Sequence, residues 1–436
     1  MDTYIIEITG MAFSGHGIGK LPDASYAYVL GAFIGDTVEV QVYKEAEGIT
    51  YAELLRITIP SPHRTELPSE APFFDANAPW RFLSDTVENS MKHSLITELF
   101  EGSQMNVRTT PLRTTNYRNK AAYSFLKKDG TLHFALYPRG VAHSQKIIYR
   151  GNILVNENIN SLSSVFLNFL NQKNVPLETL KYLTIRYSYY TDSMVAEILV
   201  TESSRKKLAW KKSELIALMN QHTQLQGIIV AQSSPHVRTA DVVKEFYSIG
   251  TTDVQEKLGS RMYTYHPSQF FQIYPAAFQQ ILDDCEQYIS SIENHIDYRL
   301  LDLFAGVGVI GIHLTPYVKS VHAVERSPLS KKYAEMNAKG IQNFSHTEAH
   351  VDEICDYIQH EQILVLDPPR SGCSRTILEK INDVQPQHII YISCNPETQK
   401  RDFDTISNHY KMKGAKMYNL FPNTPHIEHV LYLERR

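Results

Sequence analysis

A lone cysteine ends an apolar run near the end of the chain. Residues 388–393 read His-Ile-Ile-Tyr-Ile-Ser, and Cys394, Asn395 and Pro396 follow. A single cysteine is most often a packed core residue. Here the proline prevents the strand from continuing, so we expect the thiol at the carboxyl end of a strand, where open α/β sheets bind ligands. Cys394 is therefore a candidate nucleophile.

A carboxylate that could act with this thiol follows in Phe-Pro-Asn-Thr-Pro-His-Ile-Glu, residues 421–428. Together with a methyl donor, the pair could alkylate C5 of uracil, which is a poor carbon nucleophile. Addition of a thiolate to C6 makes C5 electron-rich, and a base must later remove the C5 proton so that the thiol can leave. Glu428 is the carboxylate in this stretch. His426 and His429 are alternative bases, although lone histidines are more often hydrogen-bonding partners.

Three glycines form a nucleotide-binding signature in Leu-Leu-Asp-Leu-Phe-Ala-Gly-Val-Gly-Val-Ile-Gly. Gly306, Gly308 and Gly311 lie directly after a predicted strand and before a predicted helix, where glycine permits a tight turn and close approach of a ligand. Glu325 ends the next strand, where a carboxylate can bind both ribose hydroxyls. NAD and S-adenosylmethionine both fit this pattern.

An acidic-diproline loop distinguishes these two ligands. Residues 363–372 read Ile-Leu-Val-Leu-Asp-Pro-Pro-Arg-Ser-Gly, so Asp367 begins a loop at the end of a later strand. A dehydrogenase gives no reason for such a loop, whereas a methyltransferase can use a rigid loop to hold the acceptor base. The loop resembles the Asp-Pro-Pro-Tyr of enzymes that methylate amino groups. Arg370 replaces the aromatic residue, which disfavours an amino group as the acceptor.

The composition is that of an ordinary globular protein. Of 436 residues, 43% are hydrophobic and 21% are charged. No apolar run approaches the roughly 18 residues of a membrane span, and the amino terminus lacks a signal-like segment. The four cysteines include no Cys-x-x-Cys pair, which excludes a disulfide framework and a clustered thiolate metal site. We expect a cytoplasmic protein without a metal or a membrane partner.

Charge is unevenly distributed along the chain. The net charge is −4, but residues 81–275 carry 23 basic and 15 acidic side chains, whereas residues 1–80 and 276–436 are net negative. A segregated positive region can attract phosphates whatever the total charge. Aromatic and basic residues alternate within it, as unstacked bases and phosphates require. The charge pattern is compatible with a nucleic-acid partner, but charge alone is explained at least as well by ordinary solvated faces of the protein.

The chain divides into three predicted segments. Residues 1–65 contain short strand-like runs separated by the turn signals Ser-Gly-His-Gly-Ile-Gly-Lys and Gly-Ala-Phe-Ile-Gly-Asp, which predicts a small β-barrel. Residues 80–275 contain a predicted helix over 85–101 and several strands, which predicts an α+β domain. In residues 276–436 strands and helices alternate, which predicts a Rossmann-like, mainly parallel sheet. The predicted fold class is therefore α/β with these two additional domains.

The chain resembles the RNA uracil-C5 methyltransferases, which form 5-methyluridine in ribosomal and transfer RNA. The similar motifs are Phe-Phe-Gln-Ile-Tyr-Pro at residues 270–275, the glycine turn, the Asp367 loop, Ser-Cys-Asn-Pro and residues 421–428. Residues 1–65 resemble the TRAM domain, an RNA-binding barrel, and residues 115–125 resemble the Tyr-Arg-Asn-Lys segment of the family. The resemblance implies S-adenosylmethionine as the cofactor, Cys394 as the nucleophile and Glu428 as the base.

The resemblance also implies binding roles. The cofactor contacts that it implies are Gln272, Phe304, Gly306, Gly308, Glu325, His350 and Asp367. The substrate contacts that it implies are Arg118, Lys120, Pro368 and Arg370. The TRAM-like segment favours 23S ribosomal RNA over the T-loop uridine of tRNA, and we expect the target base to flip out of its loop. A monomer is the expected state.

The sequence departs from the pattern of the family in two features, the missing cluster cysteines and one residue of the glycine turn. Many relatives hold an iron–sulfur cluster with cysteines after the TRAM domain, but residues 65–83 and 149–155 contain none, so no cluster is expected. Val309 stands in the glycine turn where some relatives have asparagine.

Two rival functions are an NAD-dependent oxidoreductase and a non-catalytic RNA-binding protein. Neither has a use for both Cys394 and Glu428.

Overall fold

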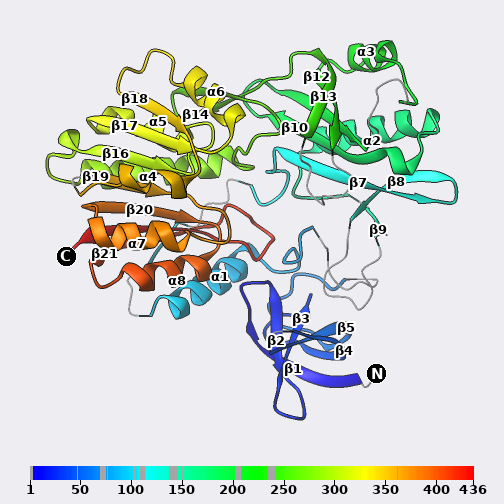
Figure 1. The fold of residues 1–436 in the computed structure, drawn as a ribbon. Coiled ribbons are helices and arrows are strands. Elements are labelled where there is room, and N and C mark those ends of the chain that lie inside the picture. Colours follow the sequence, from blue (N-terminus) through cyan, green and yellow to red (C-terminus); the bar gives the residue numbers. More distant parts are fainter. Residues whose placement is uncertain are drawn as a thin grey trace. The chain divides into compact units, whose positions relative to one another are not determined.

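The structure is a computed structural model, and it describes most of the chain (Figure 1). The described residues are 3–46, 48–68, 75, 77–101, 105–108, 113–136, 146–149, 151–201, 208–233, 242–360 and 362–436. The chain forms two compact units. One comprises residues 1–91, 113–254 and 422–425, and the other comprises residues 92–112, 255–421 and 426–436. Within the described ranges, we find no helix with the length and apolar character that crossing a membrane requires.

The first unit begins with a closed five-stranded barrel. Its strands are β1 (Thr3–Met11), β2 (His16–Lys20), β3 (Tyr26–Leu30), β4 (Thr37–Ala46) and β5 (Ile49–Ile59). Neighbouring strands follow the order β1-β2-β3-β5-β4. Apolar side chains that include Ile6, Ile8 and Val40 fill the interior, because successive side chains of a strand point to opposite faces. The small barrel expected near the amino terminus is confirmed.

Strand β2 shows that one sequence interpretation was wrong. Its glycine-rich sequence was interpreted as a turn, yet it pairs with both β1 and β3. A Cβ atom added to Gly17 would lie 2.6 Å from the carbonyl oxygen of Ala32, and one added to Gly19 would lie 2.6 Å from that of Glu7. The glycines therefore serve close approach of neighbouring backbones within a strand.

The rest of the first unit is a seven-stranded sheet with the order β13-β12-β11-β10-β7-β8-β9. Its strands are β7 (Lys120–Lys128), β8 (Thr131–Leu136), β9 (Ile147–Ile148), β10 (Leu180–Ser188), β11 (Ser193–Val200), β12 (Leu225–Ser233) and β13 (Val242–Gly250). Its helices are α2 (Glu157–Gln172), the 3₁₀ turn η1 (Leu177–Thr179) and α3 (Lys212–Asn220). Ile159, Leu162 and Phe166 lie at helical spacing on α2 and share one core with the sheet. The α+β architecture is as expected, and helix α1 (Asp85–Leu99) matches the helix predicted over residues 85–101.

The second unit contains an eight-stranded sheet with the order β18-β17-β16-β19-β20-β22-β21-β6. Its strands are β6 (Met105–Arg108), β16 (Arg299–Leu303), β17 (Ser320–Glu325), β18 (Phe344–Glu348), β19 (Gln362–Leu366), β20 (His388–Ser393), β21 (Tyr410–Tyr418) and β22 (Glu428–Arg435). Its helices are α4 (Pro275–Ser290), η3 (His295–Asp297), α5 (Val309–Leu314), η4 (Thr315–Tyr317), α6 (Pro328–Asn337), η5 (Val351–Tyr357), α7 (Arg375–Val384) and α8 (Pro396–Ile406). A separate hairpin is formed by β14 (Val254–Leu258) and β15 (Arg261–Tyr265).

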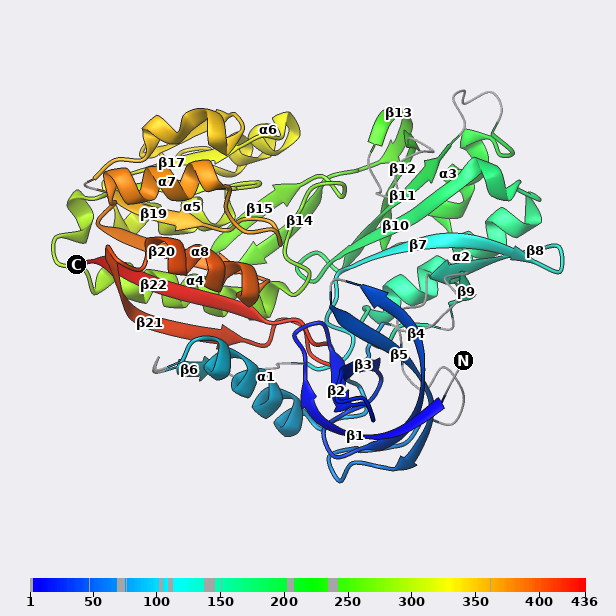
Figure 2. The same cartoon turned by 60° about the horizontal axis from the view of Figure 1, so that its bottom comes forward.

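Strands β16 to β20 are mutually parallel, so their carboxyl ends meet at one edge of the sheet. Strand β22 is antiparallel to β20, and helices α7 and α8 lie next to each other on one face (Figure 2). The Rossmann-like sheet is confirmed. The pairing of β6 with β21 was not expected, because the pattern of four residues does not tell which sheet edge they join.

Candidate active site

The glycine turn connects β16 to α5 at the carboxyl edge of the sheet. Phe304 has a φ of 64°, and Gly306 and Gly308 have φ values of 54° and 84°. Glycine adopts such angles without strain and phenylalanine rarely does, and backbone strain of this kind concentrates at functional sites. A Cβ atom added to Gly306 would meet no atom within 4 Å. The backbone at Gly306 is therefore open to close approach by a ligand.

Glu325 ends β17 and ties that strand to the turn. One carboxylate oxygen accepts a hydrogen bond from the N–H of Gly306 at 3.4 Å, and the other accepts one from the N–H of Ser327 at 3.0 Å. Two backbone donors thus fix the carboxylate beside the glycine turn. This is the position from which a carboxylate binds ribose hydroxyls in such sheets.

Asp302 is buried within β16, directly below the turn. Its Oδ2 accepts a hydrogen bond from the N–H of Gly311 at 2.9 Å, while Oδ1 has no hydrogen-bond partner among the described residues. Burial, assisted by the charges of Asp367 and Glu325, raises the pKa of Asp302 to about 8. A Cβ atom added to Gly311 would lie 2.8 Å from Oδ2 of Asp302. The third glycine of the turn therefore serves the packing of α5 against β16.

Strand pairing brings the predicted nucleophile and base together. In the antiparallel pair of β20 and β22, Ile392 lies opposite Val430 and Ser393 lies opposite His429. Cys394 and Glu428 are the chain neighbours of this last pair. The charge of Glu428 also acts on the pKa of the Cys394 thiol. The thiol and the carboxyl group therefore lie near each other at the carboxyl edge of the sheet.

Burial controls the protonation of this pair. Glu428 is 3% exposed and Cys394 is half-buried. Burial raises the pKa of the Cys394 thiol to about 12, the charges of Glu428 and Asp367 add to this effect, and Arg370 opposes it. Burial and the charge of Asp367 also raise the pKa of Glu428 well above its ordinary value. At neutral pH these surroundings favour a thiol and a carboxylic acid.

Asp367 follows β19 and adds a third acidic group. Burial raises the pKa of its carboxyl group to about 7. Asp302, Asp367 and Glu428 are thus carboxyl groups whose ionised forms are disfavoured at one sheet edge. A cation bound nearby would favour the ionised forms of all three. The electrostatics therefore suit a positively charged ligand such as a sulfonium compound.

Arg370 lies on the loop after β19 and is held against the start of α8. Its carbonyl oxygen accepts hydrogen bonds from Nδ2 of Asn395 at 2.9 Å and from Oγ1 of Thr398 at 3.1 Å. Its Nη2 lies 3.2 Å from Nδ1 of His426. These contacts place the loop beside Cys394, as the effect of Arg370 on the thiol pKa also requires.

His429 was an alternative base. It is buried, and its Nδ1 lies 2.6 Å from Oε1 of Gln399. Burial lowers the pKa of His429 to about 3. The side chain therefore remains neutral and bonded to Gln399, which fits a supporting role better than proton abstraction.

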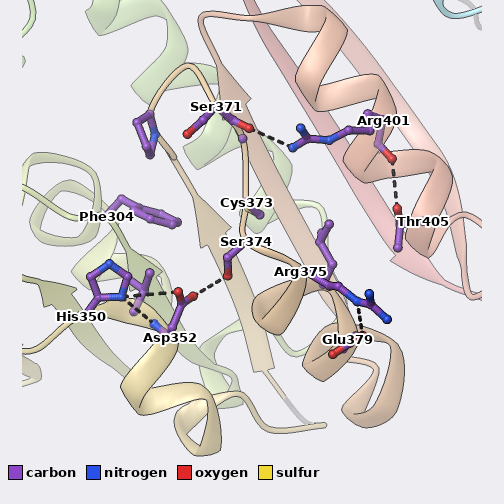
Figure 3. Close-up of a pocket in the computed structure, with 14 residues that line it drawn as sticks. Phe304, His350, Asp352, Ser371, Cys373, Ser374, Arg375, Glu379, Arg401 and Thr405 are labelled. Carbon is purple, nitrogen blue, oxygen red and sulfur yellow. Dashed lines mark hydrogen bonds and ion pairs between the residues drawn. The ribbon is translucent and has the colours of Figure 1, made fainter.

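A cavity of about 730 Å³ lies beside the loop after β19 (Figure 3). Phe304 and His350 line it, as does Pro369 of the loop. His350 precedes η5, and its Nδ1 accepts a hydrogen bond from the N–H of Asp352 at 3.4 Å. The cavity thus unites two of the predicted cofactor contacts. Arg401, which also lines it, was missed by the sequence analysis.

Gln272 and Pro368 lie elsewhere on the second unit. Gln272 is half-buried directly before α4, and Pro368 is buried in the loop after β19. The neighbouring Phe271 stacks on Tyr265, with ring centroids 4.1 Å apart and planes 6° apart. This stack fixes the backbone that carries Gln272, but neither Gln272 nor Pro368 lines the cavity.

Arg118 and Lys120 belong to the first unit, at the start of β7. Lys120 lies opposite Arg186 of β10. Burial, with the nearby charge of Arg186, lowers the pKa of Lys120 to about 8, and Glu197 opposes this effect. The guanidinium of Arg118 lies 5.8 Å from the ring centroid of Tyr117. Lys120 therefore takes part in a largely buried charge network, and its predicted RNA contact remains a prediction.

The four cysteines are unpaired, and Cys285 and Cys373 are buried. Within the described ranges, no group of three or more His, Cys, Asp or Glu side chains could hold a metal ion.

A family model described as tRNA (Uracil-5-)-methyltransferase matches residues 85–436. The chain belongs to this family. It is therefore an RNA methyltransferase, a transferase of class EC 2.1.1.

Relatives match along almost the whole chain. An uncharacterized RNA methyltransferase of Clostridium tetani is 25% identical over 459 residues, covering 99% of this chain and 96% of the relative. One of Thermotoga maritima is 25% identical over 447 residues, covering 97% of each. Among solved structures, a Pyrococcus abyssi tRNA (uracil-54, C5)-methyltransferase in complex with S-adenosyl-L-homocysteine matches with a TM-score of 0.77 and 17% identity. It covers 99% of this chain and 100% of that chain. At this identity the match establishes a common fold.

Proposed function

We propose that this protein transfers a methyl group from S-adenosylmethionine to C5 of a uridine in RNA. Family membership supports RNA uracil as the acceptor class. The observation that carries the proposal is the pairing of β20 with β22, which brings the neighbours of Cys394 and Glu428 opposite each other at the carboxyl edge of β20, so that the charge of Glu428 acts on the thiol. Neither an oxidoreductase nor a non-catalytic RNA-binding protein needs that pair.

In the first step of the proposed reaction, the thiol of Cys394 loses its proton to solvent. The side chain is half-buried, so water can reach it. The thiolate adds to C6 of the flipped uracil, and the electrons of the C5–C6 double bond move towards C5 and O4. S-adenosylmethionine supplies an electrophilic methyl group when it is bound. Once C5 carries that methyl group, the Glu428 carboxylate removes the C5 proton, the double bond re-forms and the thiolate leaves.

The residues of the second unit fit the proposed methyl donor. Gly306 offers open backbone, Glu325 is fixed for ribose hydroxyls, and Phe304 and His350 line one cavity. The raised pKa values of Asp367 and Glu428 fit a sulfonium cation. The Pyrococcus abyssi structure, described as a complex with S-adenosyl-L-homocysteine, supports the same class of ligand. Gln272 and Gly308 are further proposed contacts.

We propose 23S ribosomal RNA as the substrate, with the T-loop uridine of tRNA as the alternative. The barrel is the reason for the first, and the description of the family as tRNA methyltransferases supports the second. In this account residues 1–65 and 80–275 bind RNA, with contacts from Arg118 and Lys120, and residues 276–436 carry out catalysis. Pro368 and Arg370 hold the target base. The protein works as a cytoplasmic monomer without an iron–sulfur cluster.

The first experiment incubates purified protein with labelled S-adenosylmethionine and transcripts of 23S rRNA or tRNA, and maps 5-methyluridine by mass spectrometry. Cys394→Ala should lose turnover by at least about 10³-fold, since nucleophilic catalysis is removed, while binding to RNA and cofactor persists. Cys355→Ala is a matched control, because the Cys355 thiol donates to nearby carbonyl oxygens of η5, away from Cys394. Normal methylation by Cys394→Ala would refute the covalent scheme.

A further inference from the structure

The cavity in the second unit extends beyond the residues predicted to hold the cofactor. On one side it is lined by Phe304 and His350, and on the other by side chains of α7 and α8, among them Arg375 and Arg401 (Figure 3). The adenosine contacts proposed above account for the first side only. The second side carries two guanidinium groups, and no role assigned so far requires them.

Arg401 is held in place by a buried carboxylate. Its Nε and Nη2 donate to Oδ1 of Asp402 at 2.9 and 2.6 Å, and Nη2 also donates to the carbonyl oxygen of Ser371 at 2.9 Å. Asp402 is fully buried, and its Oδ2 accepts hydrogen bonds from the Tyr391 hydroxyl at 2.6 Å and from the N–H of Cys373 at 2.7 Å. These bonds therefore hold the guanidinium group of Arg401 in one orientation.

Gly372 makes room for this arrangement. It has a φ of 78°, and an added Cβ atom would lie 2.5 Å from Oδ2 of Asp402 and 2.6 Å from Nη2 of Arg401. Any larger residue at this position would displace the guanidinium group. The loop after β19 is thus shaped to receive Arg401.

Donors of both arginines remain available. The Arg401 side chain is 56% exposed, and its Nη1 makes no hydrogen bond to another described residue. The Arg375 side chain is 90% exposed, and among the described residues its one bonded atom is Nε, which donates to Glu379 at 2.7 Å. Guanidinium groups with free N–H pairs match the oxygens of a phosphate group in charge and geometry.

The second side of the cavity is close to the proposed reaction. The loop over residues 367–372 borders both places, because Arg370 is bonded to Asn395, next to Cys394, while Ser371 and Gly372 line the cavity. Arg401 lies five residues after the start of α8, or about 7.5 Å along the helix axis. Because α8 begins two residues after Cys394, this rise places Arg401 on the side of the reaction site where a nucleotide next to the target base would lie.

We propose that Arg401, assisted by Arg375, binds a phosphodiester group of the substrate RNA beside the flipped uridine. This inference rests on the proposed function, since it presumes an RNA strand at Cys394. The site would bind the RNA backbone where it passes the loop over residues 367–372. It would thereby help to hold the target nucleotide out of its stack. Its ligand is the RNA backbone, so it carries no sequence preference of its own.

The test uses the full-length enzyme and the RNA that it methylates best. Arg401→Gln and Arg375→Gln are compared with Arg299→Gln, an exposed arginine at the amino end of β16, on the opposite edge of the sheet. We expect the KM for RNA to rise about 10-fold in Arg401→Gln, as for the loss of a charged hydrogen bond. The dependence of RNA binding on salt should weaken by about one counterion. The KM for S-adenosylmethionine should stay near the wild-type value.

Further variants separate binding from folding. Arg401→Gln removes the guanidinium that donates to Oδ1 of Asp402, so the unfolding temperature of this variant is measured. Arg401→Lys should restore the salt dependence by keeping the charge. The bond that the Arg375 side chain makes within the described part of the chain is to the exposed Glu379, so Arg375→Gln should weaken RNA binding without loss of stability. Unchanged KM and salt dependence in both glutamine variants would overturn the inference, as would a change in cofactor affinity alone. Wild-type methylation in the same assay shows that the proposed function itself stands.

Discussion

The proposed reaction depends on the loss of a proton from Cys394 and from Glu428, which lie near each other. Both groups must ionise during the proposed reaction, yet burial raises the pKa of the thiol to about 12 and that of Glu428 well above its usual value. Arg370 is the neighbouring positive group that opposes both shifts. Its charge is therefore part of what makes the nucleophile available.

We predict that methylation becomes faster as pH rises from about 6 to about 9. The fractions of ionised Cys394 and Glu428 both increase with pH, because both pKa values lie above their ordinary positions. Single-turnover rates at saturating RNA and cofactor measure this dependence. In Arg370→Gln the rise should move to higher pH. A wild-type rate that falls over this range would contradict the assignment of ionised catalytic groups.

At the scale of elements, Asp302 joins β16 to α5 through its hydrogen bond with the N–H of Gly311, but burial destabilises its ionised form. Its folded-state pKa of about 8 exceeds the ordinary value of 3.8. The folded state therefore favours the protonated acid, and its contribution to stability is complete below about pH 4 and is lost as pH rises to about 8. An asparagine could still accept the hydrogen bond from Gly311 without ionising.

We therefore predict that Asp302→Asn gains stability relative to the wild type between about pH 5 and about pH 8. Unfolding temperatures measured at both pH values give this difference, and Asp297→Asn, at an exposed site, provides the control. The difference between Asp302→Asn and the wild type should be more positive at the higher pH. An equal difference at both would mean that Asp302 does not titrate in this window.

The sequence predicted the sheet and its glycine turn because their signals are local. Alternation of strands and helices, and glycines directly after β16, can be recognised within short windows. Strand β2 was missed because glycine usually indicates a turn, whereas Gly17 and Gly19 admit close backbone contacts. Arg401 was missed because its contacts with Ser371 and Asp402 form only where the loop after β19 packs against α8. No local sequence pattern marks that contact.

At the scale of the whole molecule, the barrel offers a surface suited to bases. The rings of His16, Tyr28 and Tyr51 lie 5.7–6.3 Å apart. Lys44 lies 5.5 Å from the ring centroid of Tyr51. Tyr51 is opposite Tyr28 on one neighbouring strand and opposite Lys44 on the other. Such a row can stack unpaired bases and attract their phosphates.

We predict that Tyr28→Ser combined with Tyr51→Ser weakens RNA binding by about 10-fold or more, as expected for the loss of base stacking. Affinity for S-adenosylmethionine should not change, because the proposed donor contacts all belong to the second unit. Filter binding and calorimetry measure the two affinities. Ile5→Ser, at an exposed position of β1, serves as the control. Equal RNA affinity in the double variant would show that this aromatic row does not bind the substrate.

The central claim is that Cys394 bonds to C6 of the target uracil and Glu428 later removes the C5 proton. Glu428→Gln keeps the shape of the base but not its basicity, so the methylated adduct should accumulate. Incubation with RNA and S-adenosylmethionine should yield a protein–RNA band that survives a denaturing gel and maps by mass spectrometry to Cys394. Adding Cys394→Ala should abolish the band. The absence of any adduct in Glu428→Gln, with RNA and cofactor bound, would contradict the account.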